Sequence, residues 1–267
     1  MKIFSSSQIF WENAEILAKR LGAEVSLNFS TWPQCPLEDC REGETILFFG
    51  SHEQADILSH YQKKLNLNYI ILQSENIESS AFCPESGYVS LLKENTVLDW
   101  SYSNMERLEK RHGVHAKGLF SFEFLQDKSV SMDRDIDIFF AGASHENRVN
   151  ILKRIRDEYP NLNCHFDLVY GLLEPEKISN ILRRAKWVLN IPYYDEAPLA
   201  THRINKALSS GCGVISPFSC DKKLDNLYSE FVHFGNVMEL IERINCLEKK
   251  KGYAELCEKM RPLLYEF

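Results

Sequence analysis

The chain has 267 residues, of which 44% are hydrophobic and 26% are charged, and its formal net charge is −7. This length favours two domains, and the composition is typical of a globular protein rather than a disordered or fibrous one. The acidic balance argues against a surface built to coat a polyanion, because nucleic-acid binding relies on clustered Lys and Arg.

Eight cysteines are scattered along the chain, and no two form a CxxC pair. Zinc sites are typically built from ligands paired at short spacing, so the sequence predicts no metal site. Polar residues interrupt segment 1–17, which argues against a signal peptide, and no apolar run approaches the length of a membrane span. We therefore expect a cytoplasmic protein with reduced, buried cysteines.

The first half of the chain alternates between expected strands and expected helices. Residues 45–50 (TILFFG) form a continuous apolar run that ends in glycine, as expected for a parallel strand buried on both faces. Strands are expected at 2–7, 23–29, 45–50, 68–75 and 96–100, and helices at 11–22, 51–66, within 86–95 and from Asn104. This order predicts a parallel sheet with crossover helices.

Residues 121–135 are polar and lack periodicity, and we place the boundary between domains 1–130 and 131–267 there. The alternation then restarts. A strand, a glycine-containing loop and a helix are expected within 135–160, further strands at 163–171, 186–194, 212–218 and 231–235, and helices at 174–185, 200–211 and within 236–267. The sequence thus predicts an α/β protein with two Rossmann-like domains facing a cleft, the last helix packing back on the N-terminal domain.

The stretch 193–216 (YYDEAPLATHRINKALSSGCGVIS) carries a cation in the first turns of a helix that follows a strand. Ligands of open α/β sheets bind at the carboxyl ends of the strands, and phosphates favour helix N-termini. Arg203 lies near the first turn, and its planar guanidinium suits a diphosphate. A salt bridge on the helix surface is the alternative explanation for this residue.

Three stretches of the chain resemble a known protein family. They are 137–155 (DIFFAGASHENRVNILKRI), 187–216 (WVLNIPYYDEAPLATHRINKALSSGCGVIS), and the pair YIILQSENI and VLDWSYSNMERL in the N-terminal half. They are similar to segments of GT-B glycosyltransferases, above all of the family related to spore-maturation and spore-coat glycosyltransferases. The second stretch is the most specific of the three.

The resemblance implies an enzyme that moves a hexosyl or pentosyl group from a nucleotide-sugar donor to an acceptor hydroxyl. The donor is expected on the residues after 135, and the acceptor on the N-terminal domain. GT-B enzymes usually require no bound metal, so no metal and no cofactor besides the nucleotide-sugar co-substrate are expected. Arg203 and the helix dipole would take the role of the metal.

The chain departs from the family pattern at two positions. The family usually has Arg, one residue and then Glu before the small-residue turn, where Arg contacts the donor's phosphates and Glu its ribose hydroxyls. Here Asn205 follows Arg203 at that spacing, and Asn can bind a hydroxyl but supplies no charge. In many retaining GT-B enzymes another Glu lies eight residues earlier, where this chain has Ala197, so Glu196 would serve through a shifted loop.

Further candidates for contact with the donor lie at predicted strand ends or in the helices that follow them: Gly142, Ala143, Arg148, Tyr170, Asn190 and His202. The small pair at 142–143 would allow close backbone approach to a ligand, although a tight turn explains it as well. Arg148 would contact phosphate or lie on a solvated helix face. Tyr170 would line the base pocket or belong to a turn, and His202 would cap or pack the helix.

Asp135 and Asp137 match the DxD pattern that binds a metal–diphosphate in the other large glycosyltransferase fold. Both residues lie where a predicted strand begins, and alternation places them on one face near its N-terminal end. Ligands bind at the opposite edge of such a sheet. We therefore reject a metal-binding role for this pair.

Two carboxylates lie near predicted strand ends in the N-terminal domain. Glu75 follows the strand at 68–75, and Asp99 precedes a serine-rich turn. A reaction that inverts the anomeric centre needs a carboxylate or a histidine to deprotonate the acceptor, which makes these two residues the candidates for that base. Glu196 is a catalytic candidate on the separate ground of the resemblance to retaining GT-B enzymes. A retaining reaction has no such requirement, and the sequence leaves the stereochemistry open.

The acceptor would be a glycan, a small molecule or, as in small phage enzymes of this architecture, a hydroxymethylated DNA base, which the acidic net charge disfavours. Two other functional classes use the same donor pocket. One is a nucleotide-sugar epimerase or hydrolase, which would turn over the donor without an acceptor. The other is a non-catalytic nucleotide-sugar binding module, for which the change from Glu to Asn at 205 would mark lost activity.

Overall fold

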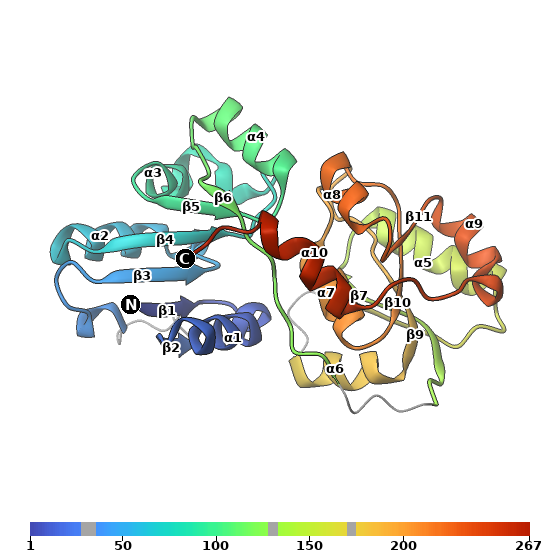
Figure 1. Ribbon diagram of the computed structural model, residues 1–267. Helices are drawn as coiled ribbons and strands as arrows, with labels where there is room; N and C mark the ends of the chain where they lie inside the picture. Colours follow the sequence, from blue (N-terminus) through green and yellow to red (C-terminus); the bar gives the residue numbers. More distant parts are fainter. Residues whose placement is uncertain (28–35, 128–132, 170–174) are drawn as a thin grey trace. The chain divides into compact units, whose positions relative to one another are not determined.

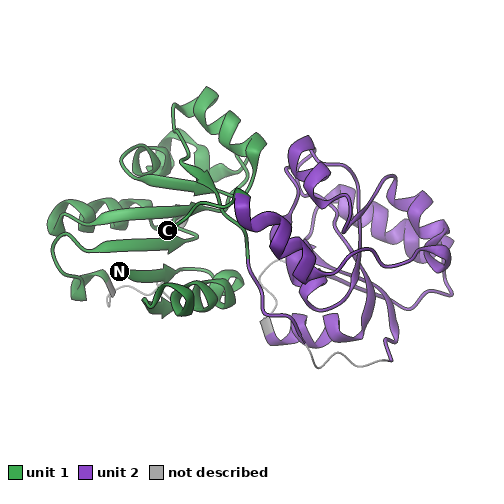
Figure 2. Ribbon diagram, viewed as in Figure 1, with its two compact units in different colours: residues 1–122, 263–267 green, residues 123–262 purple. Residues whose placement is uncertain are grey.

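The computed structural model describes residues 1–27, 36–127, 133–169 and 175–267. The chain divides into two compact units (Figure 2). Unit 1 contains Met1–Phe122 together with Leu263–Phe267, and unit 2 contains Glu123–Pro262. Figure 1 gives the labels of the helices and strands.

Unit 1 is built on a six-stranded sheet in which all neighbouring strands are parallel, as the alternation of elements predicts. Its strands are β1 (Lys2–Ser5), β2 (Glu24–Leu27), β3 (Thr45–Phe49), β4 (Asn68–Gln73), β5 (Thr96–Asp99) and β6 (Gly118–Leu119). Its helices are α1 (Trp11–Leu21), α2 (Ala55–Leu65), α3 (Tyr88–Lys93) and α4 (Tyr102–His112). The strand order is β2-β1-β3-β4-β5-β6.

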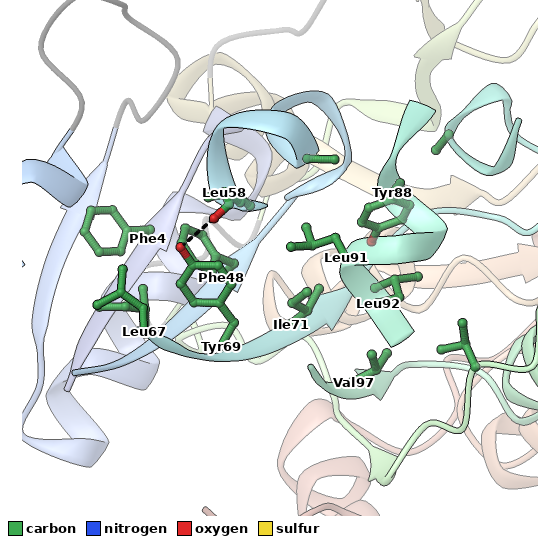
Figure 3. Close-up of a cluster of buried hydrophobic side chains, with 14 of the residues drawn as sticks. Phe4, Phe48, Leu58, Leu67, Tyr69, Ile71, Tyr88, Leu91, Leu92 and Val97 are labelled. Carbon is green, nitrogen blue, oxygen red and sulfur yellow. Dashed lines mark hydrogen bonds between the residues drawn. The ribbon is translucent and has the colours of Figure 1, made fainter. Parts of the chain in front are cut away.

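The core of unit 1 follows from the alternation of apolar side chains along buried strands. One face of the sheet presents Phe48, Tyr69 and Ile71 to helices α2 and α3, and Figure 3 shows this cluster. Tyr69 packs edge-on against Phe48 and donates from its hydroxyl to the backbone oxygen of Leu58, 2.9 Å away. This bond lets a phenol occupy an apolar core without a buried unpaired donor.

Unit 2 is built on a five-stranded parallel sheet with the order β11-β10-β9-β7-β8. Its strands are β7 (Ile136–Ala143), β8 (Cys164–Val169), β9 (Ala185–Leu189), β10 (Gly213–Ser216) and β11 (His233–Phe234). Its helices are α5 (Glu146–Glu158), α6 (Pro175–Arg184), α7 (Thr201–Ser209), α8 (Lys222–Tyr228), α9 (Val237–Glu242) and α10 (Tyr253–Met260). The short elements β6 and α8 are not among the predicted ones.

The division between the units lies earlier in the chain than 130/131. Phe124 donates its backbone N–H to the hydroxyl of Tyr253 at 2.8 Å, and Asp127 donates its own to the oxygen of Ser209 at 3.0 Å. These bonds assign the segment after Phe122 to unit 2. The last helix, α10, also packs in unit 2, against α7.

Only the five residues 263–267 return to unit 1. Leu264 forms a parallel bridge with Leu119, and the backbone N–H of Tyr265 donates to the oxygen of Leu119 at 2.8 Å. The ring of Tyr265 covers Gly118, where an added Cβ would lie 3.1 Å from the ring. The chain therefore crosses between the units twice.

The strand orders place a topological switch point in each sheet. In unit 1 the connection after β1 runs to β2 on one side, and β3 lies on the other side. In unit 2 the connection after β7 runs to β8, and β9 lies on the opposite side. Crevices form at the carboxyl ends of the two strands that flank such a point, so the β1/β3 and β7/β9 edges are where ligands are expected.

The described cysteines differ in their exposure to solvent. The described cysteines form no disulfide, but Cys220 and Cys246 are exposed, so the prediction that the thiols are buried is wrong for these two. Cys220 lies in the loop before α8, and Cys246 is the last residue of a 3-10 helix, Ile244–Cys246. Within the described residues, no helix is long and apolar enough to cross a bilayer.

Candidate functional site

Two arginine side chains meet at the carboxyl end of β7. The guanidinium carbons of Arg148, on α5, and Arg203, on α7, lie 5.4 and 5.3 Å from the centre of the Phe140 ring. A Cβ atom at Gly142 would lie 3.2 Å from Nη1 of Arg148 and 3.1 Å from Nη2 of Arg203. Gly142 therefore leaves the space that both guanidinium groups occupy.

Arg148 is held by backbone oxygens at the ends of two neighbouring strands. It is 5% exposed, its Nη1 donates to Ala143 at 2.9 Å, and its Nε and Nη2 donate to Ile191 at 3.0 and 2.8 Å. The Tyr193 ring lies on its guanidinium, 5.2 Å from centre to carbon. Arg148 thus ties the end of β7 to the loop after β9, and the prediction of a solvated helix face is wrong because the side chain is buried.

Arg203 is half-buried and is oriented by a side-chain amide. Its Nη1 donates to Oδ1 of Asn190 at 2.8 Å, and Nδ2 of Asn190 donates to the hydroxyl of Ser216 at 2.9 Å. Ser216 in turn donates to the backbone oxygen of Pro217 at 2.8 Å. The network joins the carboxyl ends of β9 and β10 and fixes the direction of the guanidinium.

The charge of this pair is not neutralised within the described part of the chain. Burial, and to a smaller degree the charge of Arg148, lowers the pKa of Arg203 to about 9. Burial likewise lowers the pKa of Arg148 to about 10, and no carboxylate acts on either group. Both side chains remain cationic at neutral pH, so a bound anion would relieve two partly desolvated positive charges.

The N-terminus of α7 contributes to the same edge of the sheet. The helix begins at Thr201 without a side-chain cap, and its nine residues place Arg203 in the first turn. Thr201 is 3% exposed, and its Oγ1 has no hydrogen-bond partner among the described residues. A buried hydroxyl without a partner at a helix N-terminus is a donor available to an anionic ligand.

Two residues of α7 that are predicted to contact the donor, His202 and Asn205, pack against neighbouring parts of unit 2. His202 packs edge-on against Phe124, with ring centres 5.0 Å apart, so it contacts the segment that enters unit 2. Asn205 is 1% exposed, and its Oδ1 accepts a hydrogen bond of 2.9 Å from the hydroxyl of Tyr228 on α8. These contacts place both side chains in the packing around α7, and their contact with a donor stays a prediction.

Two of the remaining predicted site residues of unit 2 are exposed to solvent. Glu196 is exposed on the loop between β9 and α7, and Ala143 is exposed at the end of β7. Tyr170 lies outside the described residues. Of the donor-binding candidates, Gly142, Arg148, Asn190 and Arg203 are the ones that the structure brings together.

The DxD pair lies where the alternation places it, at the N-terminal end of β7. Asp135 is bound by Arg184, and Asp137 pairs with Lys186 at 2.8 Å. Both carboxylates are thus used in surface ion pairs on the edge opposite the arginines. In the described part of the chain, no group of three or more His, Cys, Asp or Glu residues forms a metal-binding cluster.

In unit 1, Asp99 is the centre of a buried polar network at the end of β5. It is 0% exposed, and it accepts from Gln73 Nε2 at 2.9 Å, from the Ser101 N–H at 2.9 Å and from Asn104 Nδ2 at 3.1 Å. Gln73 and Asn104 also donate to the backbone oxygen of Glu75. Since Asp99 has no exposed surface, we assign it to the support of the loop after β4 rather than to contact with an acceptor.

The side chain of Glu75 faces a histidine that the sequence patterns do not single out. His52 follows β3, and its Nδ1 lies 3.6 Å from Oε1 of Glu75. The two side chains are 25% and 29% exposed. His52 escapes sequence reasoning because it reads as the polar start of a helix, and the pairing with Glu75 depends on β3 and β4 being neighbours in the sheet.

The chain has no match among protein-family models or among curated protein sequences. Solved structures are similar over nearly its whole length. HepE of Anabaena in complex with UDP and glucose has a TM-score of 0.60 at 10% identity, over 97% of this chain and 95% of that one. The GT-B fold is therefore shown.

The GT-B likeness extends to two further structures. HepE in complex with UDP-glucose has a TM-score of 0.55 at 11% identity, over 97% of this chain and 95% of HepE. AviGT4, a glycosyltransferase involved in avilamycin A biosynthesis, has a TM-score of 0.54 at 12% identity, over 99% and 93% of the two chains. The expected fold class is thus confirmed.

Proposed function

We propose that the chain is a glycosyltransferase that moves a sugar from a nucleotide-sugar to an acceptor hydroxyl. The observation that carries the proposal is the pair of cationic side chains, Arg148 and Arg203, beside Gly142 at the β7/β9 switch point. Neither is paired with a carboxylate of the described residues, and a diphosphate supplies the missing negative charge. HepE, which shares the fold, binds UDP-glucose, so we propose a UDP-sugar as the donor.

Within this proposal, each residue has a role set by its bonds. Arg203, oriented by Asn190, contacts the diphosphate, and the hydroxyl of Thr201 donates to it at the start of α7. Arg148 holds the loop after β9 in place through bonds to the backbone oxygens of Ile191 and Pro192, and it adds positive charge. The two guanidinium groups and the helix dipole stabilise the leaving diphosphate, so the transfer of a hexosyl or pentosyl group needs no metal ion and no other cofactor.

Unit 1 binds the acceptor in this proposal. Among the described residues, the carboxyl edge of its sheet carries His52, Glu75 and the buried hydroxyl of Ser51. These groups suit a hydroxylated glycan or small molecule better than a DNA base within a phosphate backbone. Membership of the spore-maturation type of family stays a prediction.

The proposal is tested by titrating UDP and UDP-glucose into the wild type and Arg203→Ala by calorimetry. Removing a charged donor to a phosphate costs about 1.5–3 kcal/mol, so the dissociation constant should rise by roughly 10- to 150-fold. Arg184→Ala is the matched control, because Arg184 is an exposed arginine of unit 2 that binds Asp135. Equal binding by wild type and Arg203→Ala would contradict the assignment of the site.

Turnover separates the transferase from the other classes that use the same pocket. A transferase forms a glycosylated product only when an acceptor is present, and it releases UDP in the same amount. Conversion of UDP-glucose to an epimer would assign the pocket to an epimerase. Hydrolysis of UDP-glucose at the same rate with and without acceptors would assign it to a hydrolase. Binding without turnover of any UDP-sugar would assign it to a binding module.

A further inference from the structure

Three buried polar atoms lie where the central strands of the unit 1 sheet end. Among the residues that the structure describes, Nε1 of Trp11, Oε1 of Gln54 and Oγ of Ser74 are shielded from solvent and have no hydrogen-bond partner. Gln54 as a whole is only 9% exposed. Buried polar groups of folded proteins are nearly always paired, because an unpaired one lowers stability. At the edge of a sheet where ligands bind, such atoms indicate bonds that a ligand completes.

Each of these three residues follows the carboxyl end of a different strand. Trp11 is the first residue of α1, after β1, whereas Gln54 precedes α2, after β3. Ser74 comes directly after the end of β4. The three strands are neighbours in the order β1-β3-β4, and Figure 1 shows them side by side. Because neighbouring strands lie about 4.8 Å apart, the three connections begin close together, at the β1/β3 switch point.

Contacts between the three connections hold them together. The hydroxyl of Ser6, after β1, donates to the backbone oxygen of Gly50, after β3. A Cβ atom at Gly50, whose φ is 69°, would lie 3.6 Å from the ring of Phe10, so these two connections are in close contact. Between the second and the third connection, Nδ1 of His52 lies 3.6 Å from Oε1 of Glu75. The three unpaired atoms therefore belong to one continuous edge within unit 1.

Aromatic rings line the same edge. The ring of Phe10 stacks on the rings of Phe49 and Phe122, with centres 5.9 and 5.5 Å apart. Phe49 also packs edge-on against Phe120, with centres 6.4 Å apart. Phe10 and the adjacent Trp11 are only partly buried, so both can present ring surface to a ligand. A wall of aromatic side chains with a few polar groups is the usual lining of a small-molecule site.

The unpaired atoms differ in what they can bond. The indole N–H of Trp11 only donates, the amide oxygen of Gln54 only accepts, and the hydroxyl of Ser74 does either. A sugar hydroxyl both donates and accepts, so this one kind of group satisfies all three atoms. A phosphate oxygen only accepts, and the oxygen of Gln54 and the carboxylate of Glu75 at the same edge would repel it.

We propose that unit 1 binds an uncharged sugar at the edge formed by Trp11, Gln54 and Ser74, and the role of that sugar as acceptor rests on the proposed glycosyl transfer. The N–H of Trp11 donates to one sugar hydroxyl, and Oε1 of Gln54 accepts from another. Ser74 bonds a third hydroxyl, and the rings of Phe10 and Trp11 pack against the carbon skeleton. All of these groups belong to unit 1, so the site binds sugar with or without a nucleotide on unit 2.

The test is a calorimetric titration of the full chain with the methyl glycosides of glucose, galactose and mannose and with glucose 6-phosphate, each with and without saturating UDP. We expect saturable binding of at least one methyl glycoside and none of glucose 6-phosphate. Gln54→Leu, Ser74→Ala and Trp11→Phe should each weaken that binding by roughly 3- to 10-fold, the usual effect of losing one neutral hydrogen bond.

Thermal unfolding of the same variants separates a ligand site from a structural role. Because Gln54→Leu removes an unpaired buried atom, it should leave the melting temperature unchanged or raise it. Gln62→Leu, on α2, is the matched control. Gln62 donates from Nε2 to Oδ1 of Asn95 at 2.8 Å, so its loss should lower the melting temperature and leave sugar binding unchanged. A loss of stability in Gln54→Leu as large as in Gln62→Leu would assign Gln54 to structure instead.

The two proposals fail in different ways. A wild type that binds UDP but none of the methyl glycosides would overturn this inference and leave the proposed function standing. Binding of glucose 6-phosphate as tight as that of the methyl glycosides, or equal sugar affinity in the wild type and all three variants, would overturn it as well. Sugar binding without any UDP binding would overturn the proposed function and leave the sugar site of unit 1 in place.

Discussion

Arg203 donates a hydrogen bond of 2.8 Å from Nη1 to Oδ1 of Asn190, and the partner is an amide rather than a carboxylate. The amide orients the guanidinium without neutralising it. Its own N–H₂ group is occupied by Ser216, 2.9 Å away, so the amide cannot turn over without losing that bond. The site therefore keeps a fixed cation whose counterion is left to a ligand.

Asn190→Asp should weaken the binding of UDP by about tenfold or more, equivalent to at least ~1.4 kcal/mol. A carboxylate at this position would pair with Arg203 and compete with the diphosphate. Calorimetric titration of UDP measures the effect, and Asn190→Ala should weaken binding less because it removes orientation without adding charge. Tighter binding of UDP by Asn190→Asp than by Asn190→Ala would contradict this account.

Gly142→Ala should lower UDP affinity by about tenfold while changing the melting temperature little. The added Cβ would lie 3.1 and 3.2 Å from nitrogens of Arg203 and Arg148, and these flexible side-chain ends would have to move. UDP titration and thermal unfolding of the same preparation separate the two effects. Ala143→Ser, at the next and exposed position, is the control and should bind UDP as the wild type does.

Gly213→Ala should destabilise the protein by about 1–3 kcal/mol, the usual cost of overpacking a core. A Cβ at Gly213 would lie 2.3 Å from Cζ3 of Trp187, a rigid ring on the neighbouring strand β9. The midpoint of urea unfolding, followed by tryptophan fluorescence, measures the change. Gly252→Ala should stay within about 0.5 kcal/mol of wild type, because the nearest neighbour of the added Cβ is the end of the Glu255 side chain, which can shift by a few tenths of an ångström.

Unit 1 should lose stability as the pH rises from about 4 to about 8. Burial raises the pKa of Asp99 from its ordinary 3.8 to about 8, against the opposing hydrogen bonds from Ser101, Gln73 and Asn104. Between these pH values the folded state holds one proton more than the unfolded state, so the free energy of unfolding falls with pH. The slope for one proton is at most about 1.4 kcal/mol per pH unit.

Asp99→Asn is the variant that isolates this effect, because its amide is neutral at every pH in the range. Its stability relative to wild type should rise between pH 4 and pH 8 and stay constant above pH 8. Chemical unfolding at a series of pH values gives both curves. A constant difference between the two proteins across that range would show that Asp99 is ionised in the folded state throughout.

Much of the fold follows from periodicity in the sequence. Continuous apolar runs such as 45–50 are strands buried on both faces, and Gly22 ends α1 in the left-handed conformation at a φ of 60°. The two-residue strand β6 and the helix α8 are missed, because two residues carry no periodicity and α8 is only seven residues long. The return of residues 263–267 to unit 1 depends on contacts distant in sequence.

The candidate site could be predicted in part. Arg203 and Gly142 stand out by residue type and position at a strand end, and the structure brings them together. Asn205 is a polar residue at a position where a ligand contact is expected. Its observed partner, Tyr228, lies on a helix that the sequence does not predict. The pairing of His52 with Glu75 is likewise set by which strands are neighbours, and a local pattern does not contain that information.

The return of residues 263–267 also has a consequence for the order of folding during synthesis. Leu264 and Tyr265 complete the edge of unit 1 beside Leu119, yet the ribosome makes them after all of unit 2. The continuous unit 2 can finish folding while unit 1 still waits for its last five residues. The N-terminal unit is thus the last to be completed, and translation that stops before residue 263 leaves the edge of β6 uncovered.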